Sequence, residues 1–90
     1  MEIEFDPGKN ALNIKKHGVS LEAAARLVWE EAYTWTDERF AYEEWRMLAL
    51  APLGDRLFCV AYVDRNEVRR VISLRPATNR EKMIYVAEYR

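Results

Sequence analysis

The sequence predicts an α+β domain in which an antiparallel sheet of about four strands is covered by two N-terminal helices and one C-terminal helix. Two observations predict this class. Residues 57–63 form an almost continuous apolar run, which is typical of an interior strand. Residues 67–75 form a second strand-like run that leads directly into a helix signal at Thr78. The length of 90 residues predicts a single domain, 1–90, with one modest core.

Composition narrows the class of protein. Half of the residues are hydrophobic, 32% are charged and the net charge is −1, as in an ordinary folded domain. No apolar run approaches the roughly 20 residues that a membrane span needs, and the acidic N-terminus is not a signal peptide. We therefore expect a cytoplasmic protein without membrane contact. A single cysteine and a single histidine cannot form a structural zinc site, and we expect no metal and no cofactor.

The first third of the chain predicts a short strand and two helices. Residues 3–5 alternate with acids as a strand does. Asp6 and Pro7 have the form of an N-cap followed by proline at the first helical position, and Gly18 suits the C-terminal cap. The alanine-rich segment 21–29 predicts the second helix. The residues expected on its buried face are Leu21, Ala24, Ala25 and Val28.

The middle of the chain predicts a strand meander. Tyr33 and Trp35 alternate with threonines, and residues 45–51 form the next apolar run before a turn containing proline and glycine. The run 57–63 is expected inside the sheet, paired with residues 67–74. Several aromatic residues of this region could stack bases or could belong to the core or an interface. They are Trp29, Tyr33, Trp35, Tyr42 and Trp45.

The closing strand and helix bring several arginines together. Thr78 and Glu81 have the spacing of a capping box, which places Arg80 in the first helical turn, where backbone N–H groups favour an anion. Strict alternation along the preceding strand puts Val68, Arg70, Ile72 and Leu74 on one face and Arg69, Val71, Ser73 and Arg75 on the other. This corner of the fold is therefore a candidate phosphate site.

Two separated motifs resemble those of the BrnT family of type II toxins. The first comprises Phe5-Asp6, Lys9, Asn13 and the run Lys16-His17-Gly18-Val19-Ser20. The second comprises Arg70-Val71-Ile72-Ser73, Arg75, Ala77, Arg80, Glu81 and Tyr85. Between them, Asp37-x-Arg39, Glu44-x-Arg46 and Gly54 stand where such sequences carry similar residues. The resemblance covers almost the whole chain with consistent spacing.

This resemblance implies a RelE-like fold and a ribonuclease that cleaves RNA to inhibit translation and arrest growth. It also implies neutralisation by a cognate BrnA-like antitoxin, through which alone the toxin would contact DNA. A homodimer or a toxin–antitoxin heterotetramer is the expected assembly. Independently, three tryptophans, five tyrosines and three phenylalanines are difficult to hide in a chain of this size, which favours a protein partner. The alternative is a non-catalytic RelE-like module that sequesters an antitoxin.

RNA cleavage without a metal needs a base, a cationic cradle for the phosphate and an acid for the leaving group. Arg75 is our first candidate for the cradle, because it ends a strand close to a helix N-terminus. His17 is either the proton carrier or a helix-terminal histidine that interacts with the last carbonyls. Lys16 is either a phosphate contact or a solvated charge.

The other candidates also carry two interpretations. Arg70 belongs to the catalytic set or to a structural ion pair, and Arg80 lies in the cleft or on an exposed helix surface. Arg69, Tyr85 and Glu81 are assigned to substrate binding. Glu81 has a capping role first and a general-base role second, and Tyr85 either offers its phenol to the site or packs on the sheet.

Overall fold

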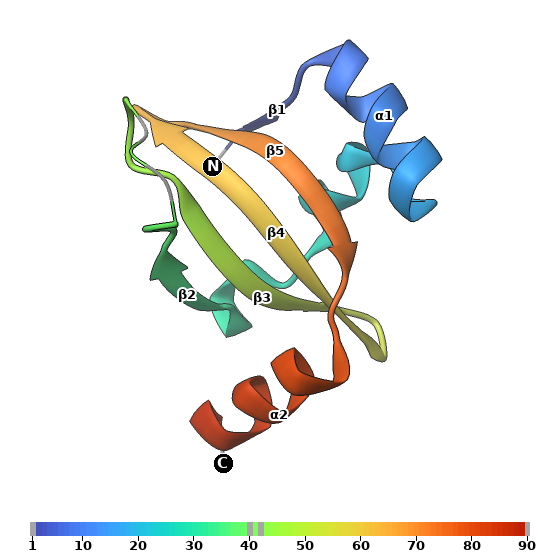
Figure 1. Ribbon diagram of the computed structural model, residues 1–90, viewed down its shortest axis with the longest axis vertical. Coiled ribbons are helices and arrows are strands. Elements are labelled where there is room, and N and C mark those ends of the chain that lie inside the picture. The colour runs from blue at the N-terminus through green and yellow to red at the C-terminus, as the bar shows by residue number, and fades with distance from the viewer. Residues whose placement is uncertain (1, 40, 42, 90) are drawn as a thin grey trace.

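The computed structural model describes residues 2–39, 41 and 43–89, and Tyr42 lies outside them. Within these ranges, one mixed sheet has five strands in the order β1-β5-β4-β3-β2 (Figure 1). The strands are β1 (Glu2–Glu4), β2 (Tyr33–Thr36), β3 (Met47–Leu53), β4 (Arg56–Arg65) and β5 (Val68–Pro76). The helices are α1 (Pro7–His17) and α2 (Asn79–Glu88), with 3-10 turns η1 (Leu21–Arg26) and η2 (Trp29–Glu31) between them. The predicted α+β class is confirmed.

Strand β1 is the main departure from the predicted sheet. The prediction of about four strands, all antiparallel, is wrong, because β1 adds a fifth strand that runs parallel to β5. The Glu2 N–H donates to the Glu67 carbonyl at 3.1 Å, which fixes this edge. Three alternating residues predict that a strand forms, but not which partner it takes. Parallel pairing joins segments that are distant along the chain, so it has no local signal.

Strand β4 has the interior position that its apolar sequence predicts, and this prediction is confirmed. It pairs antiparallel with β3 on one side and with β5 on the other. Its side chains alternate between the two faces of the sheet, and those from Phe58 to Val63 are all buried. A strand that is covered on both faces needs apolar residues at odd and even positions alike.

The segment after α1 does not form the predicted second α-helix. Leu21–Arg26 is a 3-10 helix, and the chain becomes extended at Leu27 before the short turn η2. In a 3-10 helix, residues three apart point the same way. Leu21, Ala24 and Leu27 have this spacing and are buried, whereas Ala25 is exposed. The expected buried face that contained Ala25 is therefore wrong, and Ala23 is buried in its place.

A bulge in β5 changes which arginines share a face. Ala61 pairs with Ser73 and the next residue, Tyr62, pairs with Val71, so Ile72 is an extra residue in β5. A bulge interrupts the alternation of side chains. Arg69, Val71 and Leu74 consequently face one side of the sheet, and Ser73 and Arg75 face the other. The prediction that Arg69, Val71, Ser73 and Arg75 share one face is wrong.

The predicted helix caps are confirmed. The Asp6 side chain accepts a hydrogen bond from the Lys9 N–H at 2.9 Å, and Gly18 ends α1 in the left-handed region with a φ of 72°. At α2, the Glu81 N–H donates to Thr78 Oγ1 at 3.1 Å and the Thr78 N–H donates to Glu81 Oε1 at 2.8 Å. These reciprocal bonds form the capping box.

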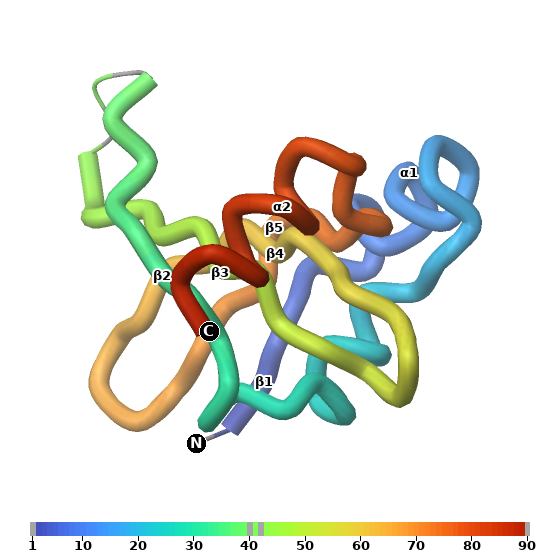
Figure 2. The backbone as a smooth tube through the Cα atoms, turned by 90° about the horizontal axis from the view of Figure 1, so that it is seen from below, coloured from blue at the N-terminus to red at the C-terminus, as the bar shows by residue number. Residues whose placement is uncertain are grey.

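The two faces of the sheet carry separate apolar clusters. The larger cluster is covered by η1 and includes Leu21, Val60, Val71 and Leu74, all at most 1% exposed. The smaller cluster consists of Leu50, Cys59 and Ala77, with Tyr33, Trp35, Leu48, Leu57 and Tyr85 packed against it. Figure 2 shows α2 (red) and η1 (cyan) lying apart from one another. Neither helix of the described chain is long and apolar enough to span a membrane.

Candidate active site

A cleft of about 740 Å³ lies on the face of the smaller cluster, between the end of α1 and the start of α2. It brings together five of the residues predicted for the site, which are Lys16, His17, Arg75, Arg80 and Glu81. These residues come from three elements, of which α1 is distant in the sequence from β5 and α2. The floor of the cleft is formed by β4 and β5. The cleft therefore gathers positive charge from α1, β5 and α2 at one place.

A buried asparagine fixes α1 against β5. Asn13 Nδ2 donates to the Leu74 carbonyl at 2.8 Å and to the Val19 carbonyl at 2.9 Å, and Asn13 Oδ1 accepts from the Leu74 N–H at 3.1 Å. Strand β1 pairs only as far along β5 as Arg70, so Leu74 has no strand partner on that side. The Asn13 amide replaces the missing strand. This contact holds the last turn of α1, with His17, next to Arg75.

Arg75 is held by a two-pronged ion pair. Its Nη1 donates to Glu81 Oε1 at 2.8 Å and its Nη2 donates to Glu81 Oε2 at 2.9 Å. This guanidinium, together with the hydrogen bond from the Thr78 N–H, lowers the pKa of Glu81 to about 2. Glu81 is therefore ionised at neutral pH and has no proton to donate. It fixes the direction of the Arg75 side chain.

His17 is the group in this cleft that can accept a proton near neutral pH. Partial burial, and then the charges of Lys16 and Arg75, lower the pKa of His17 from its ordinary value. The imidazole is therefore neutral at pH 7. Among the described residues no hydrogen bond to the His17 ring is present. At this end of α1, the Ile14 carbonyl accepts its hydrogen bond from the Gly18 N–H, at 2.7 Å. The arrangement leaves the ring of His17 available to a bound molecule.

A comparison of the sequence with known protein families identifies the family of this chain. A family model described as "Ribonuclease toxin, BrnT, of type II toxin-antitoxin system" matches residues 5–81. The chain belongs to the BrnT family. It is a ribonuclease toxin of a type II toxin–antitoxin system, an RNA-cleaving enzyme with a cognate antitoxin. The resemblance found in the two sequence motifs is thus confirmed. A comparison with curated proteins found no match.

The cleft of this BrnT-family toxin also contains residues that sequence reasoning did not assign to the site. Arg39 lines it while forming a two-pronged pair with the fully buried carboxylate of Asp37, both bonds being 2.8 Å. The Asp-x-Arg spacing in the family resemblance was the available signal. Cys59 lies on the floor, and burial raises its pKa to about 11, so the thiol is protonated at neutral pH and is not a nucleophile.

Three predicted site residues lie outside the lining of this cleft. Arg70 Nη1 donates to Glu4 Oε1 at 3.2 Å, since β1 places Glu4 opposite Arg70. Arg69 lies on the other face of the sheet, where its guanidinium is 4.3 Å from the centre of the Tyr62 ring. The hydroxyl of Tyr85 donates to the Glu31 carbonyl at 2.7 Å. The catalytic role expected for Arg70, and the substrate-binding roles expected for Arg69 and Tyr85, remain predictions without support from this geometry.

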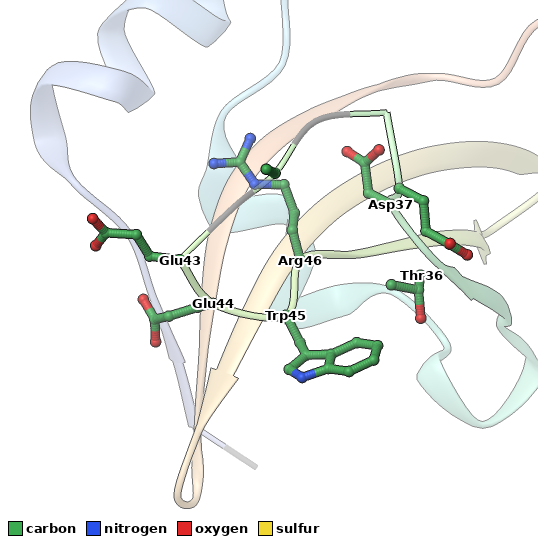
Figure 3. Close-up of a pocket in the computed structure, with 8 residues that line it drawn as sticks. Thr36, Asp37, Glu43, Glu44, Trp45 and Arg46 are labelled. Carbon is green, nitrogen blue, oxygen red and sulfur yellow. The ribbon is translucent and has the colours of Figure 1, made fainter.

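A second cavity, of about 380 Å³, lies beyond the end of β2. Figure 3 shows its lining, in which the Arg46 side chain and the Trp45 ring point in opposite directions. Its carboxylates are Asp37, Glu38, Glu43 and Glu44. This concentration of negative charge opposes phosphate binding. RNA is therefore better matched to the cationic cleft.

The side chains of the described residues can be compared with the ligands that a metal ion needs. They contain no group of three or more His, Cys, Asp or Glu side chains placed to hold a metal ion. Within the cationic cleft, Glu81 is the one lining carboxylate among the residues described, and both of its oxygens are bound to Arg75. Hard cations are usually bound by several oxygen ligands. The donor set of the cleft fits an anion instead.

Proposed function

We propose that this toxin cleaves RNA in the cationic cleft without a metal, through attack of a 2′-hydroxyl on the adjacent phosphate. The observation that carries this proposal is the convergence of Arg75, Lys16 and Arg80 around a neutral His17. A cationic site stabilises the charge that develops on the phosphate in the transition state. The same convergence favours the enzyme over the alternative of a non-catalytic binding module, which requires no such arrangement.

Arg75 keeps donors for the substrate while it is bound to Glu81. A guanidinium has five N–H groups. Nη1 uses its two for Glu81 and for the Pro76 carbonyl at 3.3 Å, and Nη2 uses one for Glu81. The Nε–H and the second Nη2–H remain, and they can bind two phosphate oxygens. Glu81 then acts as a positioning residue for Arg75.

The two proton transfers are assigned to His17 and Lys16. His17 removes the proton from the 2′-hydroxyl as its oxygen forms the bond to phosphorus, and the bond from phosphorus to the 5′-oxygen breaks. Lys16 gives a proton to that leaving oxygen, because an arginine cannot give up its own. Arg80, exposed in the first turn of α2, contacts a neighbouring phosphate. The products are a 2′,3′-cyclic phosphate and a 5′-hydroxyl end.

The partner is proposed to be a BrnA-like antitoxin that carries the DNA-binding function, in a heterotetramer, with the toxin acting in the cytoplasm. One observation supports the protein partner, and a second supports contact with DNA through that partner alone. Met83 and Val86 of α2 are 74% and 51% exposed although they are apolar. The net charge of −1 gives the toxin no general attraction for DNA. Light scattering of the toxin with and without its antitoxin measures the assembly and also tests for a homodimer.

Digestion of a defined RNA tests the chemistry. Purified, antitoxin-free toxin in excess EDTA is expected to cleave the RNA and leave cyclic phosphate and 5′-hydroxyl ends. Lys16→Ala should slow this cleavage, and the neighbouring, exposed Lys15→Ala is the matched control. Activity that requires an added divalent ion, or products with 5′-phosphate ends, would contradict the proposal.

The pH dependence tests His17. Since the pKa of His17 is lowered, the base is already active at pH 7. The wild-type rate should therefore hold down to the ordinary histidine pKa of about 6.5 and fall only in more acidic solution. His17→Ala should cleave more slowly and should lose this acidic limb. A His17→Ala protein with an unchanged pH profile would show that His17 is structural.

A further inference from the structure

The cationic cleft has an aromatic end that the proposed chemistry does not use. Opposite the phosphate-binding residues, its wall is formed by Trp35 of β2, Leu48 of β3 and Ile84 of α2. The strand order places Trp35 and Leu48 on the far side of β4 from Arg75. A nucleotide has the same division, with a charged phosphate at one end and a flat apolar base at the other.

The register of the sheet sets the distance between the two ends. Trp35 pairs with Leu48, Leu48 with Ala61, and Ala61 with Ser73, which forms one row across four strands. Arg75 stands two residues beyond Ser73 on the same face. Three strand spacings are roughly 14 Å between backbones. Two long side chains that extend over such a gap leave room for one or two nucleotides between them.

The floor between the two ends consists of small side chains. Cys59, Ala61 and Ser73 occupy the positions between Arg75 and the Trp35–Leu48 pair. On the opposite face, the same strand β4 carries the large residues Phe58 and Tyr62. The small residues therefore lie on the face where the cleft is found, and they leave its volume open.

Trp35 is held in place but is not covered. Its ring lies 5.6 Å from the ring of Tyr33 at an angle of 36°, and it packs on the smaller apolar cluster. The side chain remains only partly buried, and it lines the cleft. An aromatic ring that packs on the protein on one side and is accessible elsewhere can serve as a surface on which a base stacks.

We infer that Trp35 stacks on an unpaired base next to the scissile phosphate, so that the toxin selects single-stranded RNA. The inference rests on the proposed function, which places the phosphate at Arg75. Bases of single-stranded RNA can turn outward and stack on aromatic side chains, whereas those of a duplex are enclosed within the helix. Among the described residues that line the acidic cavity beside Trp45, Arg46 is the one cation against four carboxylates, so this cavity carries no such expectation.

Binding measured without cleavage tests this inference. The probe is a fluorescent 2′-O-methyl RNA oligonucleotide of mixed sequence, which lacks the attacking hydroxyl, used as a single strand and as a duplex. Trp35→Leu keeps apolar volume but removes the aromatic surface, and it should weaken single-strand binding roughly tenfold. Trp45→Leu, at an exposed tryptophan outside this cleft, is the matched control and should leave the affinity unchanged.

An abasic scan provides a second measurement, which does not depend on how well a variant folds. One base at a time is removed from the single strand, and one or two positions should weaken wild-type binding about as much as Trp35→Leu does. Those positions should have no further effect on Trp35→Leu. Equal binding of all abasic strands by the wild type would overturn the inference, as would an equal loss of duplex binding in Trp35→Leu. Failure of the proposed chemistry is distinguishable, since it appears in the cleavage of unmodified RNA by the Arg75 variants.

Discussion

The two faces of the sheet differ in how completely they are covered. The face under η1 has a continuous cluster in which the largest side chains, such as Leu21 and Leu74, are fully buried. The face under α2 has only Leu50, Cys59 and Ala77 in its buried cluster, as far as the described residues extend. None of the residues of α2 is buried. One face therefore supplies most of the apolar burial that stabilises the fold, and the other keeps the cationic cleft open.

This difference arises from alternation in single strands. In β4, large residues point toward η1, and small residues point toward the cleft. Apolar burial stabilises a protein in proportion to the area removed from water. Substitutions on the covered face should consequently change stability, and substitutions in the cleft should change activity. The following predictions test this division.

The largest effect is expected for Arg75 on the open face. Arg75→Ala should reduce RNA cleavage on the order of 100-fold or more, because an interaction aimed at the transition-state charge is lost. Arg75→Lys should recover only part of the activity, because an ammonium lacks the planar fork. The rates are measured on unmodified RNA, with the exposed Arg26→Ala as control. A folded Arg75→Ala protein with the wild-type rate would remove Arg75 from the site.

Asn13 joins the covered face to the cleft, and its replacement should affect stability first. Asn13→Ala leaves the N–H and the carbonyl of Leu74 without partners in a buried place. Each such group costs about 1–3 kcal/mol, so the free energy of unfolding should fall by about 2 kcal/mol or more. Urea denaturation measures this loss, with the exposed Asn79→Ala as control. An unchanged midpoint would show that α1 is held to β5 in another way.

Thr78 should make a smaller contribution to stability. Thr78→Ala removes the side-chain half of the capping box and should cost about 1 kcal/mol. Thermal unfolding of the variant is compared with that of Thr34→Ala, an exposed threonine on β2. If the two variants melt alike, the cap does not stabilise α2 measurably.

The smallest effect is the pH dependence that Glu81 adds to stability. Its pKa is lowered to about 2 in the folded protein from an ordinary value near 4.5. The stabilisation is therefore fully present above pH 4.5 and is lost as the pH falls toward 2. Glu81→Gln keeps a hydrogen-bond acceptor for the cap but lacks the charge. Its deficit in melting temperature relative to wild type should narrow between pH 4.5 and 2, and a constant deficit would argue against the ion pair.

Patterns within a few residues determined much of this protein without any structure. The caps at Asp6, Gly18 and Thr78 each depend on hydrogen bonds or backbone angles within about four residues. The interior position of β4 follows from its unbroken apolar sequence, and the family follows from motifs with consistent spacing. For the candidate site, the α1 end and the β5–α2 corner were both predicted from the sequence, and residues of both line one cleft. These features are local, and the sequence displays them directly.

Only the tertiary structure decided how these pieces meet. It placed β1 parallel to β5, introduced the bulge at Ile72 and brought Trp35 into the same cleft as Arg75. It also separated Arg69 and Arg70 from that cleft, although both lie within six residues of Arg75 in the chain. The register of a strand depends on its partner, which comes from a distant part of the chain. A shift of one residue in register moves every following side chain to the opposite face, and no local pattern records that shift.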